Sequence, residues 1–547
     1  MTSADEPIAT MRDILKPYER DPQRLNQRLL SILIVVLVAG FCLVYGFAFA
    51  LFAPKLLLPL VAPLPLMAMV AIWALPETRT APTRTLTGLT FAFFVGLVMW
   101  PNYIALALPG LPWITMVRLT GFPLVLTLLI CVSVSKTFRK TLAASLSAAP
   151  IIWQTLAGFV LIQAVSVGFS AQPGFSIDKF VVAQVGWTSM FFVSAYVFLT
   201  PGRVQKMAGM LWLMVIPVGI IGVFEWRHQQ VLWAGHIPSF LQIDDPAVTQ
   251  TLTAKFRDGS DQYRTHSTFN TSLGLGEYLA LTLPFIIHFA LGKYSWLLKA
   301  AAVATIPFLV FIVYITGSRL SVVGCMMSFL FYAVVWALLY WRANRESILA
   351  PAFVLALPIG LAIAAGIVLF WRPLHDLAFG GNGATKSSTE ARQQQLALAI
   401  PKFLSHPWGY GIGNGAKTVG FTIQNGTLTL DSYYITVAIE YGIVGFIVYY
   451  GLLALSIFIA ARYSFLSIGK SKDYGFLVPL AIALMNFFVI KMVYSAEDNH
   501  AIVYMFLGMI VATVSRLRND NKPAVQAGSH LGGPRSPRMP AHQPPRP

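Results

Sequence analysis

The sequence predicts an all-α polytopic membrane protein, with about fourteen transmembrane helices and two long loops on the non-cytoplasmic side. Three observations lead to this class. Only 11% of the 547 residues are charged and 56% are apolar, whereas a soluble domain carries roughly 25% charged residues. Apolar runs of about 17–25 residues recur along the chain. Basic residues concentrate in every second connection between those runs.

The apolar runs mark the predicted spans, each long enough to cross the hydrocarbon core as a helix. The first run is too long for the apolar part of a signal peptide, so no cleavable signal is predicted. The spans fall at 29–52, 56–75, 86–108, 119–134, 150–170, 180–200, 209–226, 272–291, 300–316, 319–341, 351–371, 433–461, 475–494 and 501–515.

The distribution of basic residues predicts the orientation. Alternate connections carry clusters such as Lys136–Lys140 and Arg462–Lys472, whereas the connections between them hold isolated charges such as Lys55 and Lys179. By the positive-inside rule, both termini lie in the cytoplasm. This asymmetry accounts for the formal net charge of +17, so nucleic-acid binding is not predicted.

The composition divides the chain into four parts. Each of the three cysteines lies inside an apolar run without metal-like spacing, so no disulfide, metal site or cofactor is predicted. The parts are a cytoplasmic segment 1–28, N-terminal transmembrane helices 29–208, a membrane domain 209–515 with non-cytoplasmic loops 227–267 and 372–430, and a disordered cytoplasmic tail 516–547.

The second long loop contains a predicted helix with an arginine on one face. A capping-box pattern begins at Ser387, and Leu396, Ile400 and Phe403 follow at helical spacing. Arg392 precedes Leu396 by four residues, so it lies on the same predicted stripe. An arginine there either points into the protein, where it could bind an anion, or snorkels towards water.

Two acidic residues flank the start of the next predicted span. Asp431 stands at its outer end, where it is either a functional carboxylate or a helix N-cap. Glu440 lies nine positions later, roughly 13 Å deeper in a continuous helix. It is either functional or hydrogen-bonded to a neighbouring helix. The glycine-rich stretch 406–415 precedes both, and it either cradles an anion or forms a turn.

Two further arginines lie near predicted outer helix ends. Arg319 follows directly after one span and begins the next, where it either binds an anion or snorkels. Arg264 closes the first long loop. The same loop contains Asp244 and Asp245, a pair that could bind a metal but reads more simply as a turn.

In this order, the motifs resemble those of the O-antigen ligase and O-antigen polymerase superfamily over about residues 210–515. The N-terminal spans match no pattern of the family. The motifs that carry the resemblance are Arg264–Asn270, Ser318-Arg319, Arg392, His406–Gly411, Asp431–Ile435 and Glu440–Gly445.

The resemblance implies a metal-independent, inverting glycosyl transfer on the periplasmic face of the membrane. The donor is an oligosaccharide on undecaprenyl diphosphate, and the two arginines that match family positions for the diphosphate are Arg319 and Arg392. Family ligases place a histidine, the proposed base, where this chain has Asp431. The same motifs make Arg264, His406, Tyr433 and Glu440 candidate substrate-binding residues.

The departure at Asp431 favours a polymerase for exopolysaccharide or O-antigen over a lipid A-core ligase. Three alternatives stay open: a ligase to a lipid or protein acceptor, a lipid-linked glycan transporter or flippase, and a scaffold for other polysaccharide-assembly proteins. A transporter should carry several charges in mid-membrane. In this sequence the polar residues concentrate in the two long loops instead.

Overall fold

The computed structural model describes residues 63–78, 80–107, 113–243, 245–253, 263–346, 349–370, 383–422, 428–467 and 470–521, with Gly426 and five isolated positions in the first apolar run. The predicted segment 1–28, most of the first predicted span and the tail beyond residue 521 lie outside the described residues.

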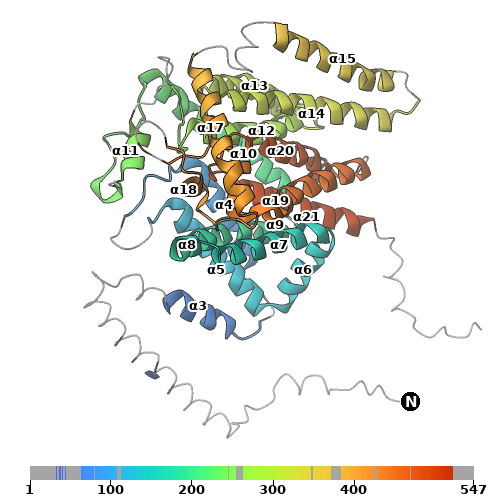
Figure 1. The fold of residues 1–547 in the computed structure, drawn as a ribbon. Helices are drawn as coiled ribbons and strands as arrows, with labels where there is room; N and C mark the ends of the chain where they lie inside the picture. Colours follow the sequence, from blue (N-terminus) through green and yellow to red (C-terminus); the bar gives the residue numbers. More distant parts are fainter. Residues whose placement is uncertain are drawn as a thin grey trace, which may run out of the picture. The chain divides into compact units, whose positions relative to one another are not determined.

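The described residues are almost entirely helical (Figure 1). Among them, β-structure is limited to two isolated bridges, Leu106 with Ile114 and Thr422 with Leu428. The helices are α3 (Pro63–Trp73), α4 (Thr83–Met99), α5 (Met116–Val134), α6 (Lys136–Ser147), α7 (Pro150–Val167), α8 (Pro173–Ala183), π-turn η1 (Gln184–Thr188), α9 (Ser189–Val197), α10 (Arg203–His228), η2 (Ser239–Leu241), α11 (Pro246–Leu252), α12 (Ser272–Leu291), α13 (Trp296–Ile315), α14 (Arg319–Ala343), α15 (Leu349–Phe370), α17 (Gly383–Ser405), α18 (Gly415–Val419), α19 (Tyr433–Leu466), η4 (Lys472–Phe476), α20 (Leu477–Ile490) and α21 (His500–Asp520).

Ten helices in the described residues are long and apolar enough to cross a membrane. The predicted all-α polytopic class is therefore confirmed, whereas the number of about fourteen spans stays a prediction. One predicted span, 86–108, ends early at Met99. The reason is local, because Pro101 disfavours helical geometry at the preceding residue, and Trp100 is extended (φ −108°, ψ 122°).

The chain divides into two compact units, Met1–Ala71 with Ala107–Trp113, and Ile72–Leu106 with Ile114–Pro547. In the first unit, the described residues are most of α3, Ala107, Trp113 and the five isolated positions of the first apolar run. The second unit contains all the other helices and every predicted functional residue.

Loops gather at one end of the second unit, which we call the loop face and define as the described residues of 100–106, 228–271, 383–432 and 491–499. Hydrogen bonds join these segments: Trp233 Nε1 donates to the Tyr103 hydroxyl at 3.1 Å, and Asn270 Nδ2 donates to Asp498 Oδ1 at 3.0 Å. In Figure 1, α17 runs across the direction of the neighbouring spans, so it is a surface helix of the loop face.

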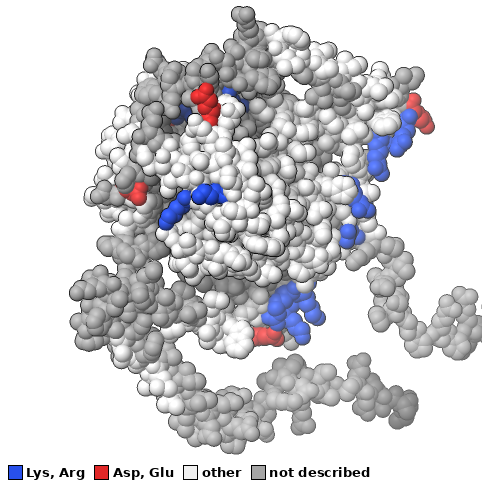
Figure 2. Space-filling model, viewed as in Figure 1, with Lys and Arg blue, Asp and Glu red and all other residues white. Residues whose placement is uncertain are grey.

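Basic residues gather at the opposite helix ends. Asp473 accepts hydrogen bonds there from the Gly202 amide at 2.6 Å and from Arg516 Nη2 at 3.0 Å. Figure 2 shows Lys and Arg along the right-hand and lower edges of that view, a further basic group on its left-hand side, and a broad surface almost free of charge between them. The orientation of the chain in the membrane stays a prediction.

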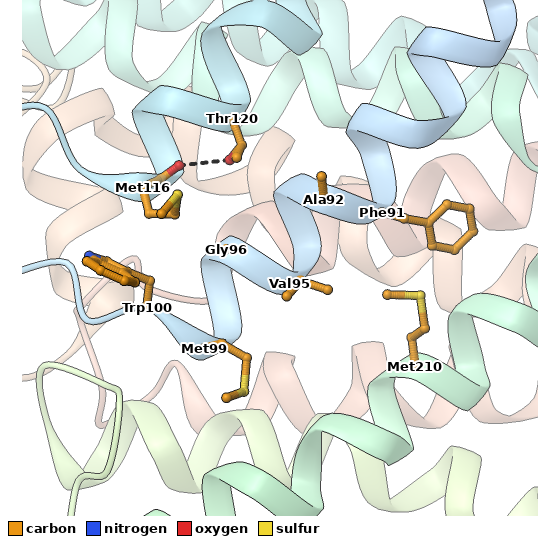
Figure 3. Close-up of a pocket in the computed structure, with 9 residues that line it drawn as sticks. All are labelled: Phe91, Ala92, Val95, Gly96, Met99, Trp100, Met116, Thr120 and Met210. Atoms are coloured by element: carbon orange, nitrogen blue, oxygen red, sulfur yellow. Dashed lines mark hydrogen bonds between the residues drawn. The ribbon is translucent and has the colours of Figure 1, made fainter.

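A hollow of about 440 Å³ lies between α4, α5 and α10, in the N-terminal half of the second unit (Figure 3). Apolar side chains line it. Thr120 is the one hydroxyl in its wall, and that hydroxyl donates to the Met116 carbonyl oxygen at 2.8 Å.

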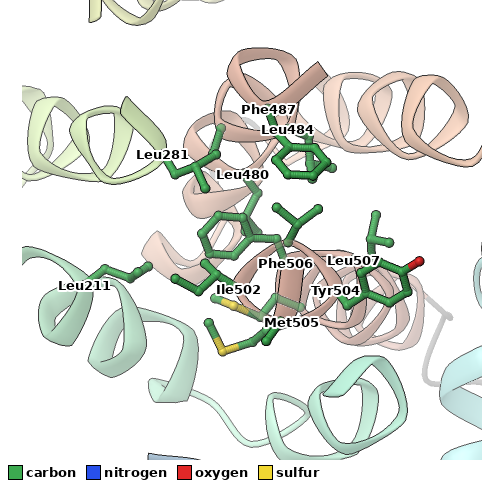
Figure 4. Packing of buried hydrophobic residues seen from close by; sticks show 14 of the residues in the cluster. Leu211, Leu281, Leu480, Leu484, Phe487, Ile502, Tyr504, Met505, Phe506 and Leu507 are labelled. Carbon is green, nitrogen blue, oxygen red and sulfur yellow. The ribbon is translucent and has the colours of Figure 1, made fainter. Parts of the chain in front are cut away.

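The core of the second unit surrounds α12, α20 and α21 (Figure 4). Nearly every residue of α21 from His500 to Leu517 is buried. The close approach of α21 to α9 requires Gly508, because a Cβ there would lie 2.5 Å from the Phe191 carbonyl oxygen. Such a helix, apolar on all sides, is expected at the centre of a membrane bundle.

The helix α19 is broken at Gly442, which has φ 68° and ψ −169°. The glycine-rich stretch fills the break: Ile443 N–H donates to the Pro407 carbonyl at 3.0 Å, and Gly411 N–H donates to the Glu440 carbonyl at 3.0 Å. The sequence predicted one continuous helix here. Because residues after the break suffice to cross the bilayer, Glu440 lies near the outer end of the span.

A buried ion pair joins three elements beneath the loop face. Lys491 Nζ lies 3.0 Å from Glu277 Oε1, and both side chains are fully buried. Asn499 Nδ2 donates to the other Glu277 oxygen at 2.9 Å, and the Lys491 ammonium also donates to the Ala496 carbonyl at 2.5 Å. The Lys491 carbonyl accepts the Tyr433 N–H at 3.0 Å, so the pair fixes the start of α19.

The break at Gly442 gives the first prediction. Gly442→Ala should lower the free energy of unfolding by about 1–3 kcal/mol, because the residue has positive φ and its Cβ would lie 2.1 Å from the Pro407 carbonyl oxygen. Thermal unfolding of the purified protein in detergent measures this. Gly451→Ala in the same helix is the control, since a Cβ there meets nothing within 4 Å. Equal stability of the two variants would contradict the account.

The buried pair gives the second prediction. Lys491→Met should cost about 3–5 kcal/mol of stability, because it leaves the Glu277 carboxylate buried without a counter-charge. The double variant Lys491→Met with Glu277→Met should be more stable than either single variant. The same unfolding assay tests both. Purely additive losses would show that the two residues contribute independently.

Candidate active site

The structure brings two predicted site residues together at the loop face. Arg392, on α17, has its Nε 4.0 Å from Asp431 Oδ2, just before α19. Both side chains are about one-third exposed, at 33% and 36%. The Arg392 Nε is itself buried and has no hydrogen-bond acceptor among the described residues, so this guanidinium is close to a carboxylate but not saturated by it.

The orientation of α17 differs from the predicted stripe. Leu396 and Ile400 are 48% and 49% exposed, whereas Gln395 and Ala399 are buried. The reason is a hydrogen bond, because Gln395 Oε1 accepts the Asp431 N–H at 2.9 Å and turns that face inward. Arg392 therefore borders the buried face, and an apolar face of α17 is left exposed.

The surroundings of Asp431 change its acidity. Burial raises the pKa of the Asp431 carboxyl above its ordinary value, while the Arg392 guanidinium and the hydrogen bond with Gln395 oppose that rise. A carboxyl with a raised pKa is a stronger base once it is ionised.

Arg319 and Arg264 lie at one junction, between α13 and α14. Arg319 is the first residue of α14, after the N-cap Ser318, whose Oγ accepts the Ser321 N–H at 3.3 Å. Arg264 Nε donates to the Thr316 carbonyl at 3.4 Å. Leu320 packs beside Tyr494, which places this junction next to the loop between α20 and α21.

Glu225 holds the segment from Tyr263 to Asn270, and the sequence analysis did not single it out. Its carboxylate accepts the His266 N–H at 3.1 Å, the Ser267 N–H at 2.6 Å and the Tyr263 hydroxyl at 3.0 Å. The sequence did contain a signal for this role, because Glu225 is a lone carboxylate close to the end of the apolar run 209–226.

The other predicted substrate-binding residues have different surroundings. His406 is exposed, with its Nδ1 2.8 Å from the Tyr410 hydroxyl, and lies about 20 Å along α17 from Arg392. Tyr433 is buried, and its ring contacts His500 edge-on at 4.8 Å. Glu440 is buried and accepts the Gly415 N–H at 3.1 Å. The structure does not bring these three into contact with the Arg392–Asp431 pair.

The loop 491–499 completes the site and was also not predicted. Ser495 Oγ donates to the Leu430 carbonyl, which ties this loop to the residue before Asp431. Glu497, on the same loop, is exposed to solvent, so it is a second candidate base.

Metal binding gains no support from the described part of the chain, in which no group of three or more His, Cys, Asp or Glu side chains could hold an ion. Of the predicted acidic pair, Asp244 lies outside the described residues and Asp245 is described just before α11.

These helices and this loop-borne site define a polytopic membrane protein with a polar centre at one end of its bundle. A family model described as O-antigen ligase matches residues 303–450. The predicted resemblance to the O-antigen ligase and polymerase superfamily is therefore confirmed, and the matched segment includes Arg319, Arg392, Asp431 and Glu440. It indicates an O-antigen-ligase-type function, in a family of glycosyltransferase-like ligases and polymerases that act on lipid-linked oligosaccharides in a membrane. A comparison with curated proteins finds no match.

Proposed function

We propose that the protein is a glycan polymerase that joins oligosaccharide units carried on undecaprenyl diphosphate, at the periplasmic face of the bacterial inner membrane. The acceptor hydroxyl attacks the anomeric carbon of the donor sugar. The bond from that carbon to the diphosphate oxygen breaks, and the configuration inverts. The hydroxyl proton passes to a carboxylate, and the diphosphate leaves on its carrier.

The observation that carries this proposal is the state of Arg392. A buried guanidinium N–H without an acceptor is costly. A phosphate oxygen would satisfy it, since guanidinium groups bind phosphates through charged hydrogen bonds. Arg392 sits in the matched segment and beside a carboxylate. A diphosphate on Arg392 would therefore have its leaving oxygen near a candidate base, and the cation would stabilise the charge that develops there.

Arg319 is proposed as the second cation for the diphosphate, and Asp431 as the base. Asp431 is partly buried, and this burial raises the pKa of its carboxyl, which makes the ionised group a stronger base. The exposed apolar face of α17 supports a carrier lipid beside Arg392, because Leu396 and Ile400 would otherwise face water. Glu497 is the alternative base, since it lies on a loop bonded to Leu430.

A ligase is the second candidate function, because the matching family model is itself described as O-antigen ligase. Family ligases have a histidine at the position of Asp431. The aspartate in this chain therefore favours the polymerase. The polymerase and the ligase differ in product. A polymerase lengthens the carrier-linked glycan, whereas a ligase transfers the glycan from the carrier to another acceptor.

Substitution of the proposed site residues gives the third prediction. In a strain without the native copy, Arg319→Ala, Arg392→Ala and Asp431→Asn should each abolish long surface polysaccharide and cause single carrier-linked repeats to accumulate. We expect a loss of at least about 100-fold, the usual cost of removing a group that stabilises the transition state. Membrane abundance of each variant is measured alongside. Lys402→Ala on the exposed end of α17 is the control.

Retention of long polymer in all three variants would refute the proposed mechanism. Accumulation of full-length polymer on the carrier, with loss of transfer to lipid A-core, would instead establish the ligase. Unchanged chain assembly with loss of lipid flipping would establish a transporter.

The acidity of Asp431 gives the fourth prediction. If ionised Asp431 is the base, activity falls as the pH drops through its pKa. Gln395→Leu removes a hydrogen bond that lowers this pKa, so the acidic limb of the pH–rate profile should move to higher pH. Gln394→Leu, on the exposed side of α17, is the control. If the acidic limb of the pH–rate profile does not move in Gln395→Leu but disappears in Glu497→Gln, the base is Glu497.

A further inference from the structure

The hollow between α4, α5 and α10, which we call the α4–α5 groove, is not used by the mechanism above. Its walls include Phe91 and Val95 from α4, Met116 from α5 and Met210 from α10 (Figure 3). The only wall hydroxyl, on Thr120, is already bonded to the helix backbone. The Trp100 indole N–H is also occupied, because it donates to the Ile104 carbonyl at 2.8 Å. The groove therefore offers no free side-chain hydrogen-bonding group to a ligand.

The groove runs beside membrane spans, since α5 and α10 are both long and apolar enough to cross the bilayer. Its surroundings are therefore hydrocarbon, and its natural occupant is a hydrocarbon chain. Three methionines, Met99, Met116 and Met210, contribute to the lining. Methionine side chains are flexible and polarisable, so they adapt to an irregular, methyl-branched chain.

One end of the groove reaches the loop face. Trp100 and Met116 lie where α4 ends and α5 begins, on the side opposite the basic connections. The Val98 carbonyl accepts the Thr268 hydroxyl at 2.7 Å, and the Tyr103 ring meets His266 edge-on at 6.3 Å. A lipid leaving the groove beside Trp100 therefore emerges next to the 263–270 segment.

That segment leads into the candidate active site. Asn270 Nδ2 donates to Asp498 Oδ1 at 3.0 Å, one residue from Glu497. The groove thus approaches the site through the N-terminal helices, which lie outside the matched residues 303–450. Arg392 and the exposed face of α17 belong to the matched part.

We propose that the α4–α5 groove binds the polyprenyl chain of the acceptor, the second lipid-linked glycan in each polymerisation step. This inference rests on the proposed polymerase, which must hold two polyprenyl-linked glycans at once. The donor's diphosphate occupies Arg392 and Arg319, and its chain follows α17. The acceptor therefore needs a separate hydrocarbon site, and the groove supplies it. The N-terminal helices gain a function in this way.

A bulky residue in the groove tests the proposal. Ala92 lines the groove and is exposed, so Ala92→Trp fills the space without disturbing the core. We expect a rise of at least 10-fold in KM for a polyprenyl diphosphate-linked acceptor, with the KM for the donor unchanged. Gly88→Trp is the control, because Gly88 is exposed one turn away and faces open space.

Crosslinking identifies the occupant. A photoreactive benzoylphenylalanine in place of Ala92 should capture polyprenyl diphosphate in native membranes, and the same residue in place of Gly88 should capture phospholipid. Capture of only phospholipid, or of this chain's own N-terminal residues, at position 92 would overturn the proposal. So would a normal acceptor KM in Ala92→Trp.

The polymerase proposal and the groove proposal can be refuted independently. Arg392→Ala should abolish transfer and still allow capture of polyprenyl diphosphate at position 92. Full activity of Arg392→Ala would refute the proposed function whatever occupies the groove. An inactive Arg392→Ala together with an unaffected Ala92→Trp would refute the groove alone.

Discussion

The buried pair between Lys491 and Glu277 is the interaction on which the loop face depends. Neither side chain reaches solvent, and a charge in such surroundings is tolerated only when it is paired and hydrogen-bonded. Asn499 and the Ala496 carbonyl supply the additional bonds. Because the Lys491 backbone also holds Tyr433, the pair ties α12, the loop after α20 and the start of α19 into one frame beneath Asp431.

Arg392 is the opposite case on the same frame. The Lys491 ammonium has both a carboxylate and a carbonyl as acceptors, whereas Arg392 Nε lies 4.0 Å from Asp431 Oδ2, too far for a hydrogen bond. A saturated cation fixes structure, and an unsaturated one at a rigid, partly exposed position is prepared for an anion. The proposed diphosphate site therefore holds a partly exposed cation whose buried Nε has no hydrogen-bond acceptor among the described residues.

The sequence predicted the class, most of the spans and Arg392 and Asp431 as separate candidate site residues, because apolar length, charge alternation and motif order are local properties. It did not predict Glu225 or Glu497, because the partners of these carboxylates are far away in the chain: Glu225 binds the backbone at His266 and Ser267. The inward face of α17 was also predicted wrongly, since the hydrogen bond that the Asp431 N–H donates to Gln395 Oε1 turns the Gln395 face inward. The break at Gly442 depends on Pro407, which only the folded chain brings close.

The most direct test of the central claim is a transfer reaction with purified protein, reconstituted in vesicles that contain a synthetic polyprenyl diphosphate-linked repeat and a chelator. The account predicts dimers and longer glycans with inverted configuration at each new linkage, and one free polyprenyl diphosphate released for every bond formed. Retained configuration, release of carrier without glycan joining, or no reaction under conditions in which the protein is folded would contradict it.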